Sequence, residues 1–255
     1  LSFLEDDSPP TQHEPLGDAE TAVKRRIALT QASAITPRRT EWLWEGRMAR
    51  GALSLVAGSE GTGKSTLCYW LVARVTRGEL PGELYGQPRA VFVAATEDSW
   101  AHTIVPRLMA AGADLTLVYR VEVTTTLGTH GSLLLPADLP AMAEAIREKD
   151  AALLLLDPLT SRLSESLDTH KDSDTRRALE PLAAYADELG IAVIGLMHFN
   201  KSGSTNPMSL VMASKAFTAV ARSVSTVVKD PEDESGSARL FGTPKNNLGR
   251  DDLPT

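Results

Sequence analysis

The sequence has one cysteine and few aromatic residues. Cys68 is the single cysteine among 255 residues, and aromatic side chains make up 5% of the chain. One cysteine cannot form a disulfide within the chain, which fits a reducing cytoplasm. No apolar run approaches the roughly 18 residues that a membrane-spanning helix needs. We therefore expect a cytoplasmic protein with no membrane partner.

Positive charge is also sparse at the start of the chain, where no Lys or Arg precedes Lys24. Residues 1–37 are acidic and contain proline, which predicts a flexible tail with at most one short helix. Residues 38–255 are expected to form the folded domain.

The net charge of −7 argues against a protein that coats nucleic acid along its length. A ring around a strand needs only a local basic lining, so the net charge decides little about DNA.

Short apolar runs alternate with amphipathic stretches from Leu53 onward. The runs, which predict strands buried on both faces of a sheet, lie at 53–57, 90–95, 117–123, 152–157 and 191–197. This alternation predicts an α/β fold with a mainly parallel central sheet covered by helices on both faces. After residue 215 the pattern changes to two short strand-like runs around the turn "PEDESGS". These runs predict a C-terminal antiparallel hairpin that extends the sheet edge.

The stretch "GSEGTGKS", residues 58–65, lies between the first apolar run and the first amphipathic stretch. It satisfies the phosphate-loop pattern G-x-x-x-x-G-K-[ST] in its required context, after a strand and at the start of a helix. Its glycines let backbone N–H groups surround an anion, and the helix N-terminus adds partial positive charge. Lys64 is expected to reach the β- and γ-phosphates of ATP, and the Ser65 hydroxyl to ligate Mg²⁺. The predicted nucleotide-binding residues are Gly58, Ser59, Glu60, Gly61, Thr62, Gly63, Lys64, Ser65 and Thr66.

Two acidic residues stand at the ends of later apolar runs. Asp157 closes "ALLLLD", where it can hold a water on Mg²⁺. Pro158 follows it, so the catalytic base has to come from elsewhere. Glu97 in "VFVAATEDSW" is the best candidate, if its strand lies beside the phosphate-loop strand. Asp98 could then cap the next helix.

A glutamate at the end of the second strand, together with an Asp157 that no glutamate follows, resembles the pattern of the RecA/DnaB-type ATPases. The likeness is closer to the RepA-like hexameric helicase ATPases of plasmids and phages, and to actinobacterial AAA family proteins. It is carried by "WLWEGRMARGALSLVAGSEGTGKST", "TRGELPG", "ATEDS…PRLMAAGADL" and "KNNLG", and it covers roughly residues 36 to 255. The resemblance implies a RecA-like P-loop core, ATP hydrolysis, and a homo-oligomer in the form of a hexameric ring or a filament.

The resemblance also implies roles for later residues. His198, at the end of its strand, falls where the family senses the γ-phosphate. Two long loops, 158–177 and 200–215, match the family loops that contact single-stranded nucleic acid. The cations they offer are Arg162, Lys171, Lys201 and Lys215. Neither loop carries an aromatic residue for stacking on bases.

The segment "TPKNNLGRD" resembles a family segment in which a Lys and an Arg reach the γ-phosphate bound by the next subunit. Lys245 occupies the Lys position, but Asn247 stands at the Arg position. Lys245 then acts alone, or Arg250 or Arg222 supplies the guanidinium. The leading interpretation is an oligomeric ATPase acting on nucleic acid, as a helicase or in DNA remodelling during replication or recombination. The alternatives are a RadA-like recombinase that forms filaments, a nucleotide-gated interaction module without translocation, and a small-molecule kinase.

Overall fold

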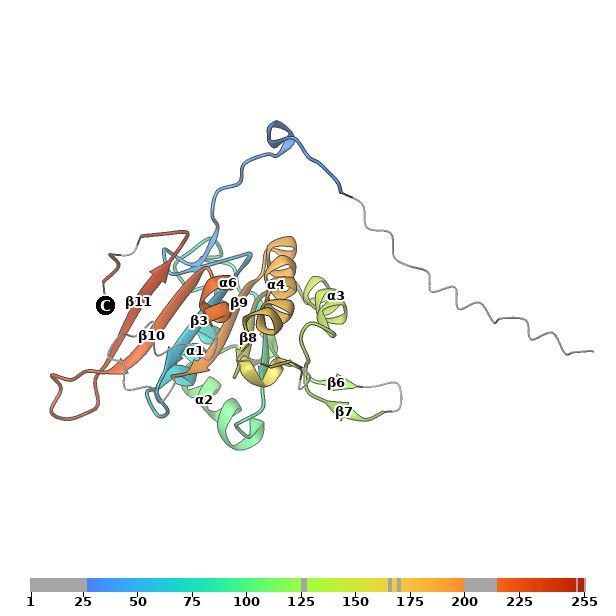
Figure 1. Ribbon diagram of the computed structural model, residues 1–255. Helices are drawn as coiled ribbons and strands as arrows, with labels where there is room; N and C mark the ends of the chain where they lie inside the picture. The colour runs from blue at the N-terminus through green and yellow to red at the C-terminus, as the bar shows by residue number, and fades with distance from the viewer. Residues whose placement is uncertain are drawn as a thin grey trace, which may run out of the picture. The chain divides into compact units, whose positions relative to one another are not determined.

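A mostly parallel sheet forms the centre of the protein (Figure 1). The computed structural model describes residues 27–124, 128–164, 167–168, 171–199, 215–250 and 252–254. The seven-stranded sheet has the order β11-β10-β3-β9-β8-β4-β5. Its strands are β3 (Ala52–Gly58), β4 (Ala90–Ala95), β5 (Val118–Arg120), β8 (Ala151–Asp157), β9 (Ala192–His198), β10 (Ser223–Lys229) and β11 (Arg239–Asn246). β11 pairs antiparallel with β10 and the other pairings are parallel, which confirms the predicted fold class.

Helices cover both faces of this sheet because its central strands are apolar on both sides. All seven residues of β3 and of β8 are buried. Leu53 and Leu55 of β3 belong to the core cluster that includes residues of α3, α4 and α6, whereas Val56 belongs to the cluster with α1 and α2. The helices are α1 (Lys64–Thr76), α2 (Val105–Ala110), α3 (Leu139–Lys149), α4 (Asp172–Leu189) and α6 (Lys215–Val220). Shorter turns are η1 (Ala32–Ala34), η2 (Trp100–Ile104), η3 (Leu115–Leu117) and η4 (Thr160–Arg162).

The run 117–123 does not form one strand, as the sequence predicted. β5 stops at Arg120, and the N–H of Val121 donates the last bond to the carbonyl of Val93. The chain then leaves the sheet and forms β6 (Val123–Thr124), which pairs antiparallel with β7 (His130–Gly131). Charged Arg120 and Glu122, which pair with each other, break the apolar run at this point.

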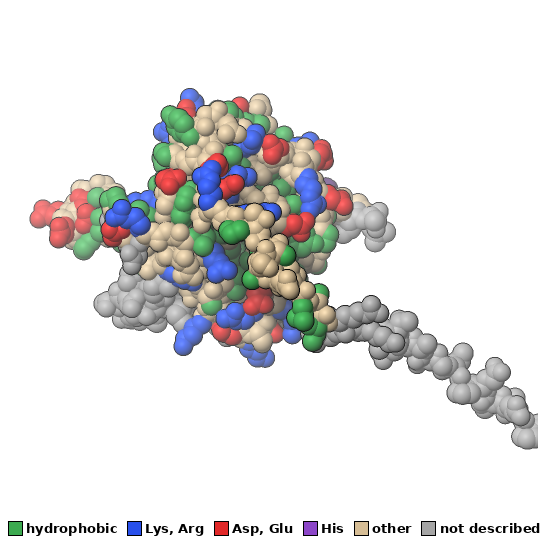
Figure 2. Space-filling view, turned by 90° about the horizontal axis from the view of Figure 1, so that it is seen from above, with side chains coloured by type: hydrophobic (Ala, Val, Ile, Leu, Met, Phe, Trp, Pro, Cys, Tyr) green, Lys and Arg blue, Asp and Glu red, His purple; other side chains and the backbone are tan. Residues whose placement is uncertain are grey.

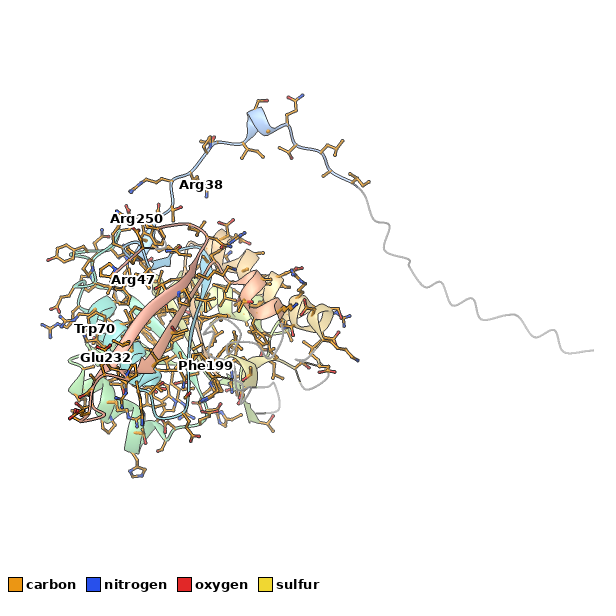
Figure 3. All side chains as sticks on the ribbon, turned by 60° about the vertical axis from the view of Figure 1, so that its left-hand side comes forward. Arg38, Arg47, Trp70, Phe199, Glu232 and Arg250 are labelled. Carbon is orange, nitrogen blue, oxygen red and sulfur yellow. The ribbon has the colours of Figure 1, made fainter. Side chains whose placement is uncertain are left out.

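The aromatic residues that precede the core strands pack at the hairpin edge. Trp44 lies in β1 (Trp42–Trp44), which pairs with β2 (Met48–Ala49). Its ring stacks on Phe241 of β11 at 5.3 Å and meets the edge of Trp70 at 5.7 Å. The guanidinium of Arg47 lies 5.2 Å from the centroids of both stacked rings. Figure 3 labels Arg47 and Trp70 among the side chains.

Contacts divide the chain into residues 1–38 and residues 39–255. The described part of the first unit, residues 27–38, contains the short turn η1, and all of its residues are exposed. The flexibility predicted for residues 1–37 stays a prediction. Among the described residues, no helix is long and apolar enough to cross a bilayer.

Candidate active site

The phosphate loop connects β3 to α1. Gly58 and Gly63 lie at positions where a side chain would clash or strain the backbone. A Cβ on Gly58 would lie 2.4 Å from the carbonyl oxygen of Val227 and 2.8 Å from Oγ1 of Thr62. Gly63, just before α1, has a φ of 92°, in the left-handed region that L side chains rarely adopt. The Thr62 hydroxyl donates to the carbonyl of Ser59 at 2.9 Å and so folds the loop over itself. The loop is therefore a close backbone turn at a helix N-terminus, the geometry that binds phosphates.

Lys64 begins α1 and lies buried in this turn. Its ammonium donates to the carbonyls of Gly58 at 3.0 Å and Ser59 at 2.8 Å, and lies 3.5 Å from Nδ1 of His198. Burial lowers the pKa of Lys64, and the negative charge of Asp157 opposes that shift. The bonds it makes are to neutral carbonyls, so an anionic phosphate would be a stronger partner.

Asp157 ends β8 next to the loop and faces Ser65. Burial raises the pKa of the Asp157 carboxyl, and a hydrogen bond with the Ser65 side chain opposes the shift. The nearby charges of Glu97 and Asp98 raise this pKa further. An Asp and a Ser oxygen are ligands that suit Mg²⁺. The residues present therefore fit the metal that this loop implies.

Glu97 and His198 complete a chain of polar groups that leads to Lys64. Nε2 of His198 lies 3.8 Å from Oε2 of Glu97, and its Nδ1 faces Lys64. The assignment of Glu97 from the sequence required its strand to lie beside the phosphate-loop strand, and this was wrong. β9 and β8 lie between β4 and β3. Glu97 still reaches the site, since parallel strands end at the same edge of the sheet.

These groups surround one cavity of about 410 Å³. Its lining residues are Glu60, Gly61, Gly63, Lys64, Ser65, Thr66, Ala95, Glu97, Asp98, Arg107, Asp157 and His198. Sequence reasoning assigned no chemistry to Arg107, although its guanidinium lies on the cavity and pairs with Asp98 at 3.0 Å. The π-helical turn η2 lies between Glu97 and Arg107. A π-helical turn has a wider angular period than an α-helix and so alters the direction of the side chains that follow it.

Asp98 is not the helix cap, as the sequence had suggested. The side chain of Ser99 accepts the capping bond from the N–H of His102 at 3.3 Å. Asp98 instead faces Arg107, so its carboxylate belongs to the cavity.

The cations expected to contact nucleic acid lie in different environments. Arg162 is 3% exposed, and its guanidinium donates to Oγ1 of Thr96 at 2.7 Å. This corrects the prediction that Arg162 is a surface cation: it closes η4 against the end of β4 and is not available to a nucleic acid. Lys171 precedes α4 and Lys215 begins α6, and both are exposed. Lys201 lies outside the described residues.

Lys245 is bound within its own chain at the edge strand β11. Its ammonium donates to the carbonyl of Thr218, and to that of Ala221 at 2.9 Å, at the end of α6. Burial lowers the pKa of Lys245, and the charge of Arg222 adds to the shift. The two candidates for the missing guanidinium are both exposed, and Arg250 forms an ion pair with Asp252. The assignment of a trans role to Lys245 therefore stays a prediction.

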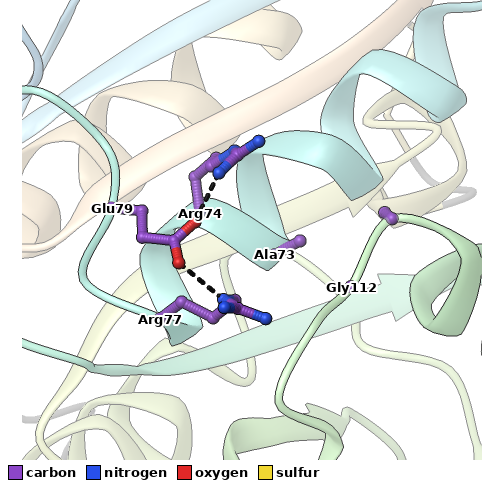
Figure 4. A pocket seen from close by; sticks show the side chains of 6 residues that line it. Ala73, Arg74, Arg77, Glu79 and Gly112 are labelled. Carbon is purple, nitrogen blue, oxygen red and sulfur yellow. Dashed lines mark hydrogen bonds and ion pairs between the residues drawn. The ribbon is translucent and has the colours of Figure 1, made fainter.

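A second cavity, of about 340 Å³, lies at the other end of α1 (Figure 4). Arg74 and Arg77 line it, and both pair with Glu79. Ala111 and Gly112, which follow α2, close the opposite wall. Its charged groups are already paired with one another.

Comparison with protein families gives a match over most of the chain. The family described as an AAA domain matches residues 19–204 of 255, well over half of the sequence. The match includes the phosphate loop, Glu97, Asp157 and His198. No curated protein matches the chain. The convergence of these residues on one cavity agrees with this match, and the chain belongs to the AAA domain family of P-loop ATPases.

Proposed function

We propose that the protein is an ATP-hydrolysing, RecA-type oligomeric motor that acts on nucleic acid, as a helicase or in DNA remodelling. The observation that carries the hydrolysis step is the cavity that joins the phosphate loop to Asp157, Glu97 and His198. A protein that only binds nucleotide does not need a glutamate at this place. The resemblance to RepA-like helicases supports the nucleic-acid role.

Each residue of the cavity has a role in this proposal. Backbone N–H groups of residues 58–66 and the ammonium of Lys64 bind the phosphates. Glu97 accepts a proton from the attacking water, because its carboxylate is exposed to the cavity and has an imidazole 3.8 Å away. His198, which lies between Glu97 and Lys64, donates a hydrogen bond to the γ-phosphate or to the attacking water.

Ser65 and Asp157 would hold Mg²⁺, Ser65 directly and Asp157 through a water. When bound there, the metal neutralises charge on the β- and γ-phosphates. The Ser65 side chain lies within hydrogen-bond reach of the Asp157 carboxyl and opposes the rise of its pKa, so the two oxygens lie near each other.

Lys171 and Lys215 support contact with a strand. The Asp172 carboxylate accepts a bond from the N–H of Ala216 at 3.2 Å, so the starts of α4 and α6 lie side by side. This places two exposed lysines near each other, Lys171 within the first predicted loop and Lys215 at the end of the second. Sparse cations of this kind suit sequence-independent contacts with a phosphate backbone.

A second candidate is a nucleotide-gated interaction module whose slow hydrolysis switches partner binding. Asn247 at the Arg position and the internal bonds of Lys245 favour it, since an Arg in trans accelerates phosphoryl transfer. Charge favours it too. The β10–β11 turn projects from the molecule and carries Asp230, Glu232, Asp233 and Glu234 (Figure 2).

The deciding measurement is the steady-state ATPase rate against protein concentration, with and without single-stranded DNA. A motor whose active sites are shared between subunits gives a rate that rises with protein concentration and with DNA.

The double variant Lys171→Ala/Lys215→Ala should weaken DNA binding and lower the slope of log K against log salt by roughly 1.4, for two lost contacts. Arg147→Ala/Lys149→Ala, at the end of α3, is the matched control and should keep the wild-type slope. A rate indifferent to DNA in the oligomer favours the nucleotide-gated module.

A further inference from the structure

Arg162 is a buried cation whose backbone is held on both sides. Its N–H donates to the carbonyl of Leu159 at 3.0 Å, and its carbonyl accepts from the N–H of Leu135 at 2.7 Å. Leu159 in turn donates from its N–H to the carbonyl of Leu196 in β9. The segment after β8 is therefore held to the sheet, and hydrogen bonds hold the backbone of Arg162 in place.

The buried guanidinium has few partners. Within the described residues it forms no ion pair, and its Nε has no hydrogen-bond partner. Burial alone lowers the pKa of Arg162. A leucine of similar volume would avoid the cost of removing this charge from water. Among the described residues, the side-chain hydrogen bond of Arg162 is with Thr96, and this contact best explains the buried guanidinium.

That contact is with Thr96, the residue just before Glu97. One guanidinium nitrogen donates to Oγ1 of Thr96 at 2.7 Å. The N–H of Thr96 donates to the carbonyl of Asp157 at 3.3 Å. Thr96 is therefore held by its backbone to the metal-binding strand and by its side chain to the segment that follows that strand.

Glu97 depends on this attachment because little else holds it. It lies beyond the last residue of β4, its side chain is 58% exposed, and the ion pair described for its carboxylate is with His198 at 3.8 Å. The position of its backbone is set by the residue on either side. Asp98, on the far side, is turned toward Arg107.

We propose that Arg162 is a positioning residue that sets the place of Glu97 through the hydroxyl of Thr96. The inference rests on the proposed function, since it assigns Glu97 as the base. A base moved by about 1 Å loses up to about 100-fold in rate without any change in how the substrate binds. The bond therefore affects kcat and leaves the affinity for ATP unchanged.

The test uses Thr96→Val and Thr96→Ser, because the exposed Thr96 tolerates both and only serine keeps the hydroxyl. We expect Thr96→Val to lower kcat by about 10- to 100-fold, with KM for ATP and the affinity for a fluorescent ATP analogue unchanged. Thr96→Ser should stay within about threefold of the wild type, because its hydroxyl can still accept the bond. A Thr96→Val kcat within about twofold of wild type, or an equal loss in Thr96→Ser, overturns the proposal.

A double-mutant cycle with Arg162→Met joins the two residues. If Arg162 acts through Thr96, Arg162→Met should add almost nothing to the loss in Thr96→Val, whereas independent effects would multiply. Thermal unfolding and analogue binding of each variant show whether it is folded. If Arg162→Met does not fold, the Thr96 pair alone decides.

Glu97→Gln separates this inference from the proposed function. An inactive Glu97→Gln with an unaffected Thr96→Val overturns the positioning role and leaves the base assignment intact. A normally active Glu97→Gln overturns both.

Discussion

The two ends of α1 each place cationic side chains beside a cavity, but the charges are balanced differently. At the N-terminus, Lys64 is bound to backbone carbonyls, and three carboxylates lie near it. At the C-terminus, Arg74 and Arg77 share the carboxylate of Glu79. In the first cavity, burial lowers the pKa of Lys64. The second cavity is exposed, and there a hydrogen bond with Arg77 lowers the pKa of Glu79.

The charges at the N-terminal end of α1 favour a bound ligand, whereas those at the C-terminal end are already balanced by one another. The buried Asp157 carboxyl, whose pKa burial raises, lies near a buried ammonium that is bound to neutral carbonyls, and both are stabilised by an incoming cation and anion together. Mg²⁺ with a triphosphate is such a pair. The paired arginines also lie where the carbonyl ends of α1 and α2 point, a position that favours positive charge without any ligand.

The largest expected effect separates the two ends directly. Lys64→Ala should lower ATP hydrolysis by at least about 100-fold, because it removes the buried charge that meets the phosphates. Arg77→Ala, at the other end of the same helix, is the matched control and should hydrolyse ATP at the wild-type rate. Steady-state phosphate release measures both. Equal losses in the two variants would contradict the distinction between the cavities.

Glu97→Gln tests whether the first cavity catalyses as well as binds. The amide cannot accept the proton of water, so we expect kcat to fall by about 10² to 10⁴-fold. ATP binding, followed with a fluorescent analogue, should persist because Glu97 is not part of the phosphate loop. Wild-type turnover would show that another group is the base.

Asp157→Asn tests the cost of the unmatched charge. The folded-state pKa of Asp157 is raised above the ordinary 3.8, so the folded protein loses stability as pH rises from that value through the raised pKa. Removing the charge should raise the Tm of the nucleotide-free protein at pH 8 by about 2–4 °C, if the cost is about 1 kcal/mol. The same variant should lose the Tm increase that Mg²⁺ and ATP give the wild type. A lower Tm than wild type at pH 8 would contradict the assignment.

The smallest effect is expected at the second cavity. Glu79→Gln leaves Arg74 and Arg77 without their carboxylate, but all three side chains are partly exposed, and water screens such pairs. We expect a Tm within about 2 °C of wild type and unchanged ATP hydrolysis. A large loss of either would mean that the two ends of α1 are coupled.

Much of this architecture was predictable from local patterns. The unbroken apolar runs predicted β3, β4, β8 and β9 within a residue or two, since a strand buried on both faces has no polar alternation. Gly190, in the left-handed conformation, ends α4, as a glycine after a helical pattern commonly does. The phosphate loop needs no long-range information, because its glycines, lysine and serine lie within eight residues.

Other features depended on contacts that no local pattern records. The burial of Arg162 follows from its contact with Thr96, which is 66 residues away, and a cation in a polar loop otherwise predicts exposure. Lys245 meets the end of α6 because β11 folds back along β10. Arg107 pairs with Asp98 across the π-helical turn η2.

The sequence by itself determined the nucleotide-binding turn and the chemical groups at the strand ends, because each is encoded over a few consecutive residues. The alternation of apolar runs and amphipathic stretches also determined the parallel sheet. Only the tertiary structure decided which of those groups meet. Glu97 reaches the cavity although two strands separate β4 from β3, and His198 lies between Glu97 and Lys64. The physical reason is that strand order sets these distances, and strand order results from how the helices pack on the two faces of the sheet.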